Sequence, residues 1–389
     1  MNNFIFDNST KVFFGKGCVE EHLPGFLRQF GPTVMLAYGG GSIKKNGVYD
    51  QVTGILADSG KQIVEFSGIM PNPTYAKVQE GAALARKESV DLILAVGGGS
   101  VMDCSKAVSL TARYDGDAWN DFWKHQGTVD FSPVPVCVIV TASGTGSEVN
   151  GEGVITNTQT KEKLGRDYHA CNARAAFMDP VYTFSLSKRQ MISGGFDSLS
   201  HMMEIYFGAP DEPNVSDDLN EALMRGVIRD LRAAIRDPRD YTARSNLMWE
   251  STMAENRIIK MGKSTDFECH MMEHQLGAYT NCNHGEGLSV LHPVYYRHIY
   301  RDGLNKFAQF AEHVWGISPD GKSKEDLALA GIDALSDFIR EIGMPTRLRE
   351  IGIDESVDLQ KIADSCEINH GGYRALTHAE ILEIFRECL

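Results

Sequence analysis

The sequence predicts two domains of different class: an α/β domain with a mostly parallel sheet over residues 1–183, and an all-helical domain over residues 184–389. In the first half, short apolar runs that end in glycine or serine loops alternate with helical segments, which is typical of βαβ units. The second half shows apolar residues at helical spacing instead. A chain of 389 residues is also long enough for two domains.

Four strands are expected in the first half, at Thr33–Tyr38, Gln62–Phe66, Asp91–Val96 and Pro135–Thr141. Helical segments follow the first three strands, so the connections are those of a parallel sheet. The second half contains long segments of helical period and no further strand-rich region, at 186–208, 217–235, 242–260, 325–343 and 377–388. We therefore expect a helical bundle there.

The net charge of −14 argues against binding to nucleic acid or to acidic membranes, because both need a basic face. No apolar run is long enough to span a bilayer, and no signal peptide is predicted at the start. The eight cysteines are scattered without a CxxC pair, which favours a cytoplasmic protein with reduced thiols. Residues 1–14 have the pattern of an apolar edge strand, which would be exposed if nothing covered it.

The segment DLILAVGGGSVMDCSKAV predicts a buried strand that runs into a phosphate-binding loop, Gly97–Ser100. Glycines allow a diphosphate to approach the backbone, and Ser100 is expected to cap a helix over 102–112 whose N-terminus attracts anions. The alternative is a tight turn without a ligand. The spacing is not GxGxxG, so the usual dinucleotide fingerprint is not met.

Two further small-residue loops, Gly39–Ser42 and Thr141–Ser147, also follow strands and should open at the same sheet edge, which favours a bound nucleotide. The first loop has no carboxylate to receive the adenosine ribose before Asp50. Ser42, Lys44 and Lys45 would instead tolerate a 2′-phosphate, so NADP(H) is preferred over NAD(H). The alternative is that both lysines are solvated surface residues.

In the second half, Asp197 and His201 are four residues apart, as are His270 and His274, and His284 follows beyond a turn. Residues at this spacing lie on one face of a helix. Imidazole and carboxylate suit a divalent first-row metal, with Fe(II), Zn(II) and Mn(II) as candidates. We predict a metal site at Asp197, His201, His270 and His284. The spacing leaves open whether His274 is a fifth ligand or handles protons.

These motifs together resemble those of the iron-containing (group III) alcohol dehydrogenases, in particular the butanol dehydrogenases and NADPH-dependent aldehyde reductases. The resemblance covers essentially the whole chain and includes FGKG (14–17), YGGGSIKKNGVYDQ (38–51), PNP (71–73), AVGGGSVMD (95–103), TASGTGSE (141–148), MDPVYT (178–183) and the two histidine spacings. It implies a dehydroquinate synthase-like fold with the active site between two domains, a homodimer, and small aldehydes or alcohols as substrates.

The resemblance also implies residue roles. It implies that Asp197, His201, His270 and His284 are the four metal ligands. It also implies that His274 lies near the substrate and Asp103 close to the nicotinamide, so these two residues are the catalytic candidates. The cofactor-binding candidates are Gly40, Gly41, Ser42, Asn72, Gly97, Gly98, Gly99, Ser100, Asp103, Thr141, Ser143, Ser147 and Lys163. NAD-preferring relatives carry Asp at the position of Gly40, which agrees with the preference for NADP(H).

The expected reaction is hydride transfer between NAD(P)H and short to medium aliphatic aldehydes, with the metal polarising the carbonyl group. Alternatives are a polyol dehydrogenase or a cyclising lyase of the same fold, and a non-catalytic nucleotide-binding protein. An apolar substrate pocket could be lined by Trp119, Phe122, Trp123, Met253 and Met261, although such residues more often form the core.

Overall fold

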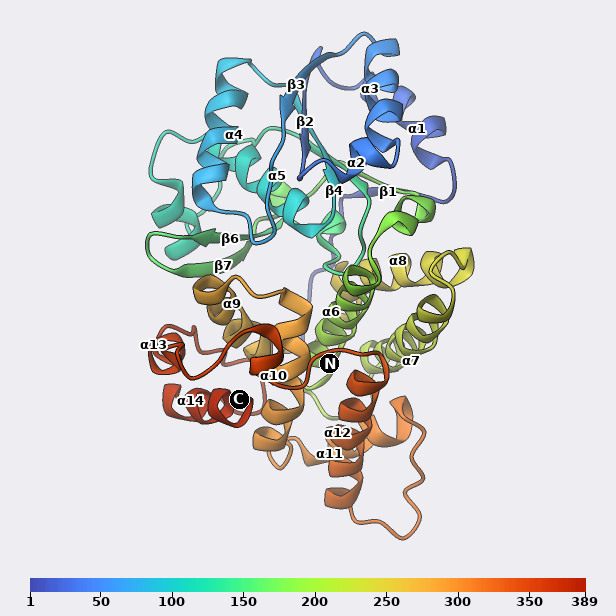
Figure 1. Cartoon of the computed structure of the whole chain (residues 1–389), viewed down its shortest axis with the longest axis vertical. Coiled ribbons are helices and arrows are strands. Elements are labelled where there is room, and N and C mark those ends of the chain that lie inside the picture. The colour runs from blue at the N-terminus through green and yellow to red at the C-terminus, as the bar shows by residue number, and fades with distance from the viewer. The chain divides into compact units, whose positions relative to one another are not determined.

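The computed structural model describes all of residues 1–389, which form two compact units (Figure 1). The α/β unit comprises Asp7–Ser187, and the helical unit comprises Met1–Phe6 together with Lys188–Leu389. One unit contains a parallel sheet and the other consists of helices, which confirms the predicted fold class. None of the helices combines the length and the apolar character that a membrane-spanning segment requires.

The α/β unit is built on a six-stranded sheet in the order β1-β8-β5-β4-β2-β3, in which every neighbouring pair is parallel. The strands are β1 (Lys11–Phe14), β2 (Thr33–Tyr38), β3 (Gln62–Phe66), β4 (Leu92–Gly97), β5 (Val136–Val140) and β8 (Ala175–Met178). Strands β2, β4 and β5 are adjacent and buried on both faces, which explains their nearly continuous apolar sequences. Their three following loops therefore leave the same edge side by side.

Helices cover both faces of this sheet (Figure 1). On one face α1 (Cys18–Leu27) and α3 (Val48–Asp58) pack on alternate residues of the central strands, next to the short α2 (Ser42–Lys45). On the other face lie α4 (Tyr75–Lys87) and α5 (Gly99–Thr111). The Thr74 hydroxyl accepts a hydrogen bond from Lys77 N and caps α4.

Three local features differ from the sequence expectations. Ser100 is not a helix cap: α5 begins at Gly99, and Gly98, in extended conformation at φ −96°, takes the capping position. A Cβ atom on Gly98 would lie 3.0 Å from the Ala142 Cβ, so the neighbouring loop favours glycine there. The antiparallel hairpin of β6 (Glu152–Asn157) and β7 (Glu162–Asp167) and the short strand β8 were not expected, because none shows a clear apolar period.

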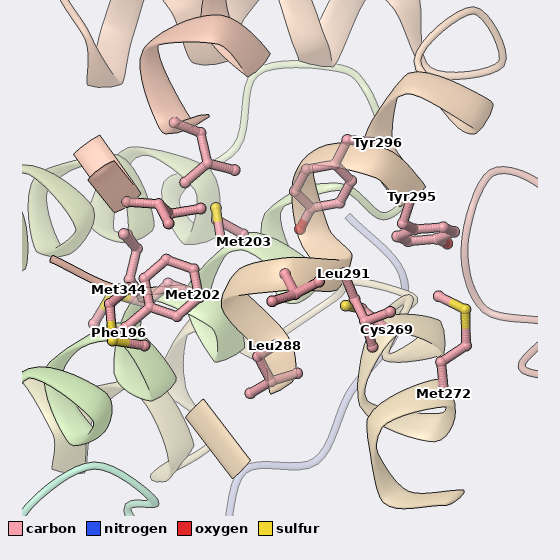
Figure 2. Packing of buried hydrophobic residues seen from close by; sticks show 14 of the residues in the cluster. Phe196, Met202, Met203, Cys269, Met272, Leu288, Leu291, Tyr295, Tyr296 and Met344 are labelled. Carbon is pink, nitrogen blue, oxygen red and sulfur yellow. The ribbon is translucent and has the colours of Figure 1, made fainter. Parts of the chain in front are cut away.

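The helical unit consists of α6 (Lys188–Tyr206), α7 (Val215–Arg236), α8 (Tyr241–Glu255), α9 (Glu268–Thr280), α10 (His284–Ile299), α11 (Leu304–Gln309), α12 (Lys324–Glu341), α13 (Leu359–Asp364) and α14 (His378–Glu387). Its core is one large cluster of apolar side chains to which all of these helices contribute, and part of it is shown in Figure 2. Phe196 and Met202 of α6, Met272 of α9 and Leu291 of α10 are fully buried there. This packing fixes α6, α9 and α10 relative to one another.

Candidate metal centre and nucleotide-binding loops

The four predicted metal ligands lie together in the helical unit. The Asp197 Oδ1 atom is 3.3 Å from His284 Nε2, 3.8 Å from His270 Nε2 and 3.9 Å from His201 Nε2. Two ligands of a tetrahedral site with bond lengths of about 2.1 Å are roughly 3.4 Å apart. Helices α6, α9 and α10 thus bring one carboxylate oxygen and three imidazole nitrogens to the spacing of a metal centre.

The residues present fit a divalent cation. Asp197 Oδ1 and His270 Nε2 are buried and have no hydrogen-bond partner, although each is a strong polar atom. Burial opposes ionisation of Asp197, but the imidazoles of His201 and His284 hold its pKa well below the usual range. With Glu204 and Glu273 close by, the cluster holds three buried carboxylates. A cation would satisfy both the unpartnered atoms and this negative charge.

Two carboxylates behind the imidazoles were not identified from the sequence. Glu204 of α6 contacts the Nδ1 atom of His270, and Glu273 of α9 contacts the Nδ1 atom of His284. Both side chains are fully buried. Their positions carry a signal that helical spacing could have revealed, since Glu204 lies one turn after His201, and Glu273 one turn after His270.

His274 lies beside the metal cluster on α9. Its ring centroid is 6.1 Å from that of His270 and 5.7 Å from that of His284, and the side chain is buried. One ring nitrogen each of His274 and His284 and a carboxylate oxygen of Glu273 all lie within 4.8 Å of one another.

In the α/β unit, two of the predicted loops pack directly on each other. Thr141 N donates to Gly97 O at 2.9 Å, and Gly99 faces the Thr145 side chain so closely that a Cβ atom would clash with it. Gly98 meets Ala142 in the same way. The glycines of this loop thus leave room for the 141–147 loop, which includes Ser143, and place the backbone N–H groups of α5 at the sheet edge.

Asp103 lies one turn into α5 and takes part in a buried network with Ser147 and Lys106. The Ser147 hydroxyl donates to Asp103 Oδ1 at 2.6 Å and accepts from Lys106 Nζ at 2.7 Å. Lys106 Nζ also donates to Asn150 Oδ1 at 3.0 Å and to Glu152 O at 2.7 Å. Burial raises the pKa of Asp103 and lowers that of Lys106, against the attraction between the two.

Two more predicted cofactor residues lie around this network. Lys163 of β7 is buried, and its charge acts on Asp103. Asn72 precedes α4, and the adjacent Pro73 O accepts from Thr156 N at 2.9 Å, which ties this segment to β6. The structure therefore brings the 71–73 segment, the Gly97–Ser100 loop and the 141–147 loop around one region of the α/β unit.

The first loop, Gly39–Ser42, contains an open position at Gly40, where an added Cβ would meet no atom within 4 Å. The sequence argument found no carboxylate here, but the neighbouring strand supplies Glu65. Its carboxylate contacts the hydroxyls of Tyr38 and Tyr49 and lies 3.8 Å from Lys44 Nζ. Lys44 also lies over the rings of both tyrosines. Lys44 is therefore already engaged, whereas Lys45 is exposed.

The aromatic residues considered for a substrate pocket belong to the core. Trp119, Phe122 and Trp123 are at most 4% exposed, and the two indole rings stack with their centroids 6.2 Å apart. Trp123 Nε1 donates to Gly153 O at 3.1 Å, so the hairpin covers this cluster. Met253 and Met261 of the helical unit are only partly buried.

Comparison with known families accounts for both units. The family described as iron-containing alcohol dehydrogenase matches residues 9–180, and its C-terminal counterpart, the Fe-containing alcohol dehydrogenase family, matches residues 191–389. The chain therefore belongs to the iron-containing alcohol dehydrogenase family. It is an oxidoreductase of the NAD(P)-dependent alcohol dehydrogenase class, which is the class that the sequence predicted, and the non-catalytic alternative is not supported.

Individual relatives are similar over at least nine tenths of their length. The chain is 38% identical to the NADH-dependent butanol dehydrogenase A of Clostridium acetobutylicum, with 100% of both chains covered. It is 35% identical to the NADPH-dependent aldehyde reductase YqhD of Escherichia coli, over 92% of this chain and 91% of that one. The crystal structure of an NADH-dependent butanol dehydrogenase A from Thermotoga maritima superposes with a TM-score of 0.94 at 36% identity, covering 100% and 99% of the two chains.

Proposed function

We propose that this protein interconverts short to medium aliphatic aldehydes and primary alcohols, as the butanol dehydrogenases do, with NADP(H) preferred over NAD(H). The observation that carries the proposal is the approach of three imidazole Nε2 atoms to Asp197 Oδ1, at 3.3–3.9 Å, in a cluster rich in buried carboxylates. Similarity to butanol dehydrogenases and to an aldehyde reductase supports the substrate class.

Asp197, His201, His270 and His284 are the proposed ligands of Fe(II), and the same donor set suits Zn(II) and Mn(II). When bound, the metal supplies a Lewis acid for the carbonyl oxygen, and the nicotinamide supplies the hydride. The four side chains would hold the positive charge of the cation at the place where negative charge develops on the substrate oxygen, so little reorganisation of the site is needed during the reaction. His274 is the proposed group that passes the proton between this oxygen and solvent.

The loop glycines Gly97, Gly98 and Gly99, with Ser100 and the 141–147 loop, are the proposed diphosphate site. Asp103 and Lys163 are proposed to hold the nicotinamide ribose end. Gly40, Gly41, Ser42 and Asn72 would bind the adenosine end, with Ser42 and Lys45 facing a 2′-phosphate. Because Glu65 engages Lys44, we expect a modest preference for NADPH and measurable activity with NADH.

We further propose a cytoplasmic homodimer. Strand β1 is an edge of the sheet, and the segment before it exposes apolar side chains, with Ile5 93% and Phe4 53% exposed. Pairing of this segment with a second copy would cover both the edge and the apolar surface. All eight cysteines are free and buried, as suits a reducing compartment.

The test combines metal analysis with kinetics. Purified protein is assayed for bound Fe, Zn and Mn. Oxidation of NADPH and NADH is followed with butyraldehyde and with shorter and longer aldehydes, and reduction of NADP⁺ and NAD⁺ is followed with butanol and with glycerol as a polyol. We expect about one metal ion per chain and the highest kcat/KM with an aliphatic aldehyde. Full turnover in thoroughly metal-free protein would overturn the proposal, and a clear preference for glycerol would make the enzyme a polyol dehydrogenase.

A further inference from the structure

Each of the two buried carboxylates behind the metal cluster contacts the Nδ1 atom of a histidine on another helix. Glu204 of α6 contacts Nδ1 of His270 on α9, and Glu273 of α9 contacts Nδ1 of His284 on α10. The two nitrogens of an imidazole point away from each other, so a group on Nδ1 lies on the far side of the ring from Nε2. In both rings it is Nε2 that approaches Asp197.

Each carboxylate uses both of its oxygens. Glu204 Oε1 accepts hydrogen bonds from the backbone N–H groups of Cys269 at 2.8 Å and of His270 at 3.3 Å, while Oε2 contacts the Nδ1 atom of His270. Glu273 Oε1 accepts weakly from the Cys282 thiol at 3.8 Å, while Oε2 takes the ring of His284. Glu204 therefore fixes the start of α9 together with its ligand, and Glu273 fixes the ring at the start of α10.

His201 lacks such a support. Its Nδ1 atom is buried and has no hydrogen-bond partner, although its Nε2 atom faces the same point as the other two rings. The ring is held by stacking on His270, with centroids 4.6 Å apart, and by its place on α6. The metal cluster thus contains two oriented rings and one that only packing holds.

We propose that Glu204 and Glu273 are positioning residues. Glu204 on α6 holds the ring of His270 on α9, and Glu273 on α9 holds the ring of His284 on α10, so that the Nε2 atom of each ring stays directed at the metal. A carboxylate on Nδ1 fixes the tautomer and orientation of a ligating histidine and makes it a stronger donor. This inference rests on the metal site of the proposed function. It adds two residues to that site that do not themselves coordinate the ion.

The experiment measures Co(II) affinity of the full chain after its own metal has been removed, by competition with a chelator and by the visible d–d absorption. We expect Glu204→Gln and Glu273→Gln each to weaken binding about 10- to 100-fold and to change the absorption spectrum. Glu268→Gln is the matched control: Glu268 is equally buried on α9, but it accepts from Asn369 N at 2.6 Å. The control should bind Co(II) within about twofold of the unmodified protein.

A double-mutant cycle separates positioning from a general effect on the fold. In a His284→Ala background, Glu273→Gln should cause no further loss of affinity, because its ring is absent. An equal loss in both backgrounds, or unchanged affinity in both glutamine variants, would overturn the proposal. Since Glu204→Gln also removes a contact at the start of α9, Glu273→Gln decides the matter if the former does not fold.

Failure of this inference can be told from failure of the proposed function. If the unmodified protein binds Co(II) and reduces aldehydes while the glutamine variants bind it equally well, only the positioning role is wrong. If the unmodified protein binds no divalent metal, the proposed function itself fails.

Discussion

The metal cluster of the helical unit and the Asp103 network of the α/β unit are both buried and polar, but they obtain positive charge differently. In the network, the Lys106 ammonium supplies it, and its three N–H groups donate to Ser147, Asn150 and Glu152. The cluster contains three buried carboxylates, those of Asp197, Glu204 and Glu273, and Asp197 Oδ1 has no hydrogen-bond partner. The charges of the network are balanced within the chain, whereas we propose that the cluster is completed by a bound divalent metal ion.

Removing one of the proposed ligands of the metal cluster should have the largest effect on activity. We expect His270→Ala to lose bound metal together with at least about a 10³-fold fall in kcat/KM, equivalent to roughly 4 kcal/mol. Metal analysis and NADPH oxidation with butyraldehyde measure both quantities. His125→Ala, which changes an exposed histidine of the α/β unit, is the control. Normal metal content in His270→Ala would contradict the ligand assignment.

Removing the Lys106 ammonium should instead destabilise the Asp103 network of the α/β unit. Lys106→Met leaves the Asp103 carboxylate buried without its strongest partner, so we expect a loss of about 3–5 kcal/mol in the free energy of unfolding. Urea unfolding followed by fluorescence measures it. Because the metal cluster belongs to the other unit, metal content of the folded variant should stay unchanged. A loss of metal equal to that of His270→Ala would contradict the distinction between the two sites.

Glu250 of α8 shows a third solution, in which a buried carboxylate takes a proton. Burial raises the pKa of Glu250 to about 8, and nearby Asp230 raises it further. The folded state therefore binds the proton more tightly than the unfolded state does. The stability that this proton contributes is fully present below the ordinary pKa of about 4.5 and is lost as the pH rises through 8. We expect Glu250→Gln to be more stable than the unmodified protein at pH 9, by on the order of 3 kcal/mol, and nearly equal at pH 5. Thermal unfolding across this range tests the sign.

The smallest effect should come from the exposed Glu65–Lys44 pair, because solvent screens it. Glu65→Gln frees Lys44 beside the first loop, so the ratio of kcat/KM for NADPH to that for NADH should rise about two- to fivefold. Lys44→Gln in the same background should reverse the gain. An unchanged ratio in Glu65→Gln would show that this lysine does not contribute to cofactor choice.

The elements that were predictable from the sequence are those with a clear period or a helical repeat. The apolar runs of β2, β4 and β5 and the one-turn spacings Asp197–His201 and His270–His274 involve only residues close in the chain. Contacts between distant segments were not visible. Glu65 reaches the first loop from a neighbouring strand, and Gly98 replaces Ser100 as helix cap because Ala142 lies against it. Such contacts depend on the tertiary packing.

The order of the supporting carboxylates along the chain has a consequence for biosynthesis. Asp197, His201 and Glu204 are synthesised before His270 and Glu273, which are synthesised before His284. Each later ring thus meets its partner carboxylate already translated, and the last donor is added only when some three quarters of the polypeptide has been made. The complete set of four donors does not exist before that point, so we expect the four-ligand site to form late in synthesis.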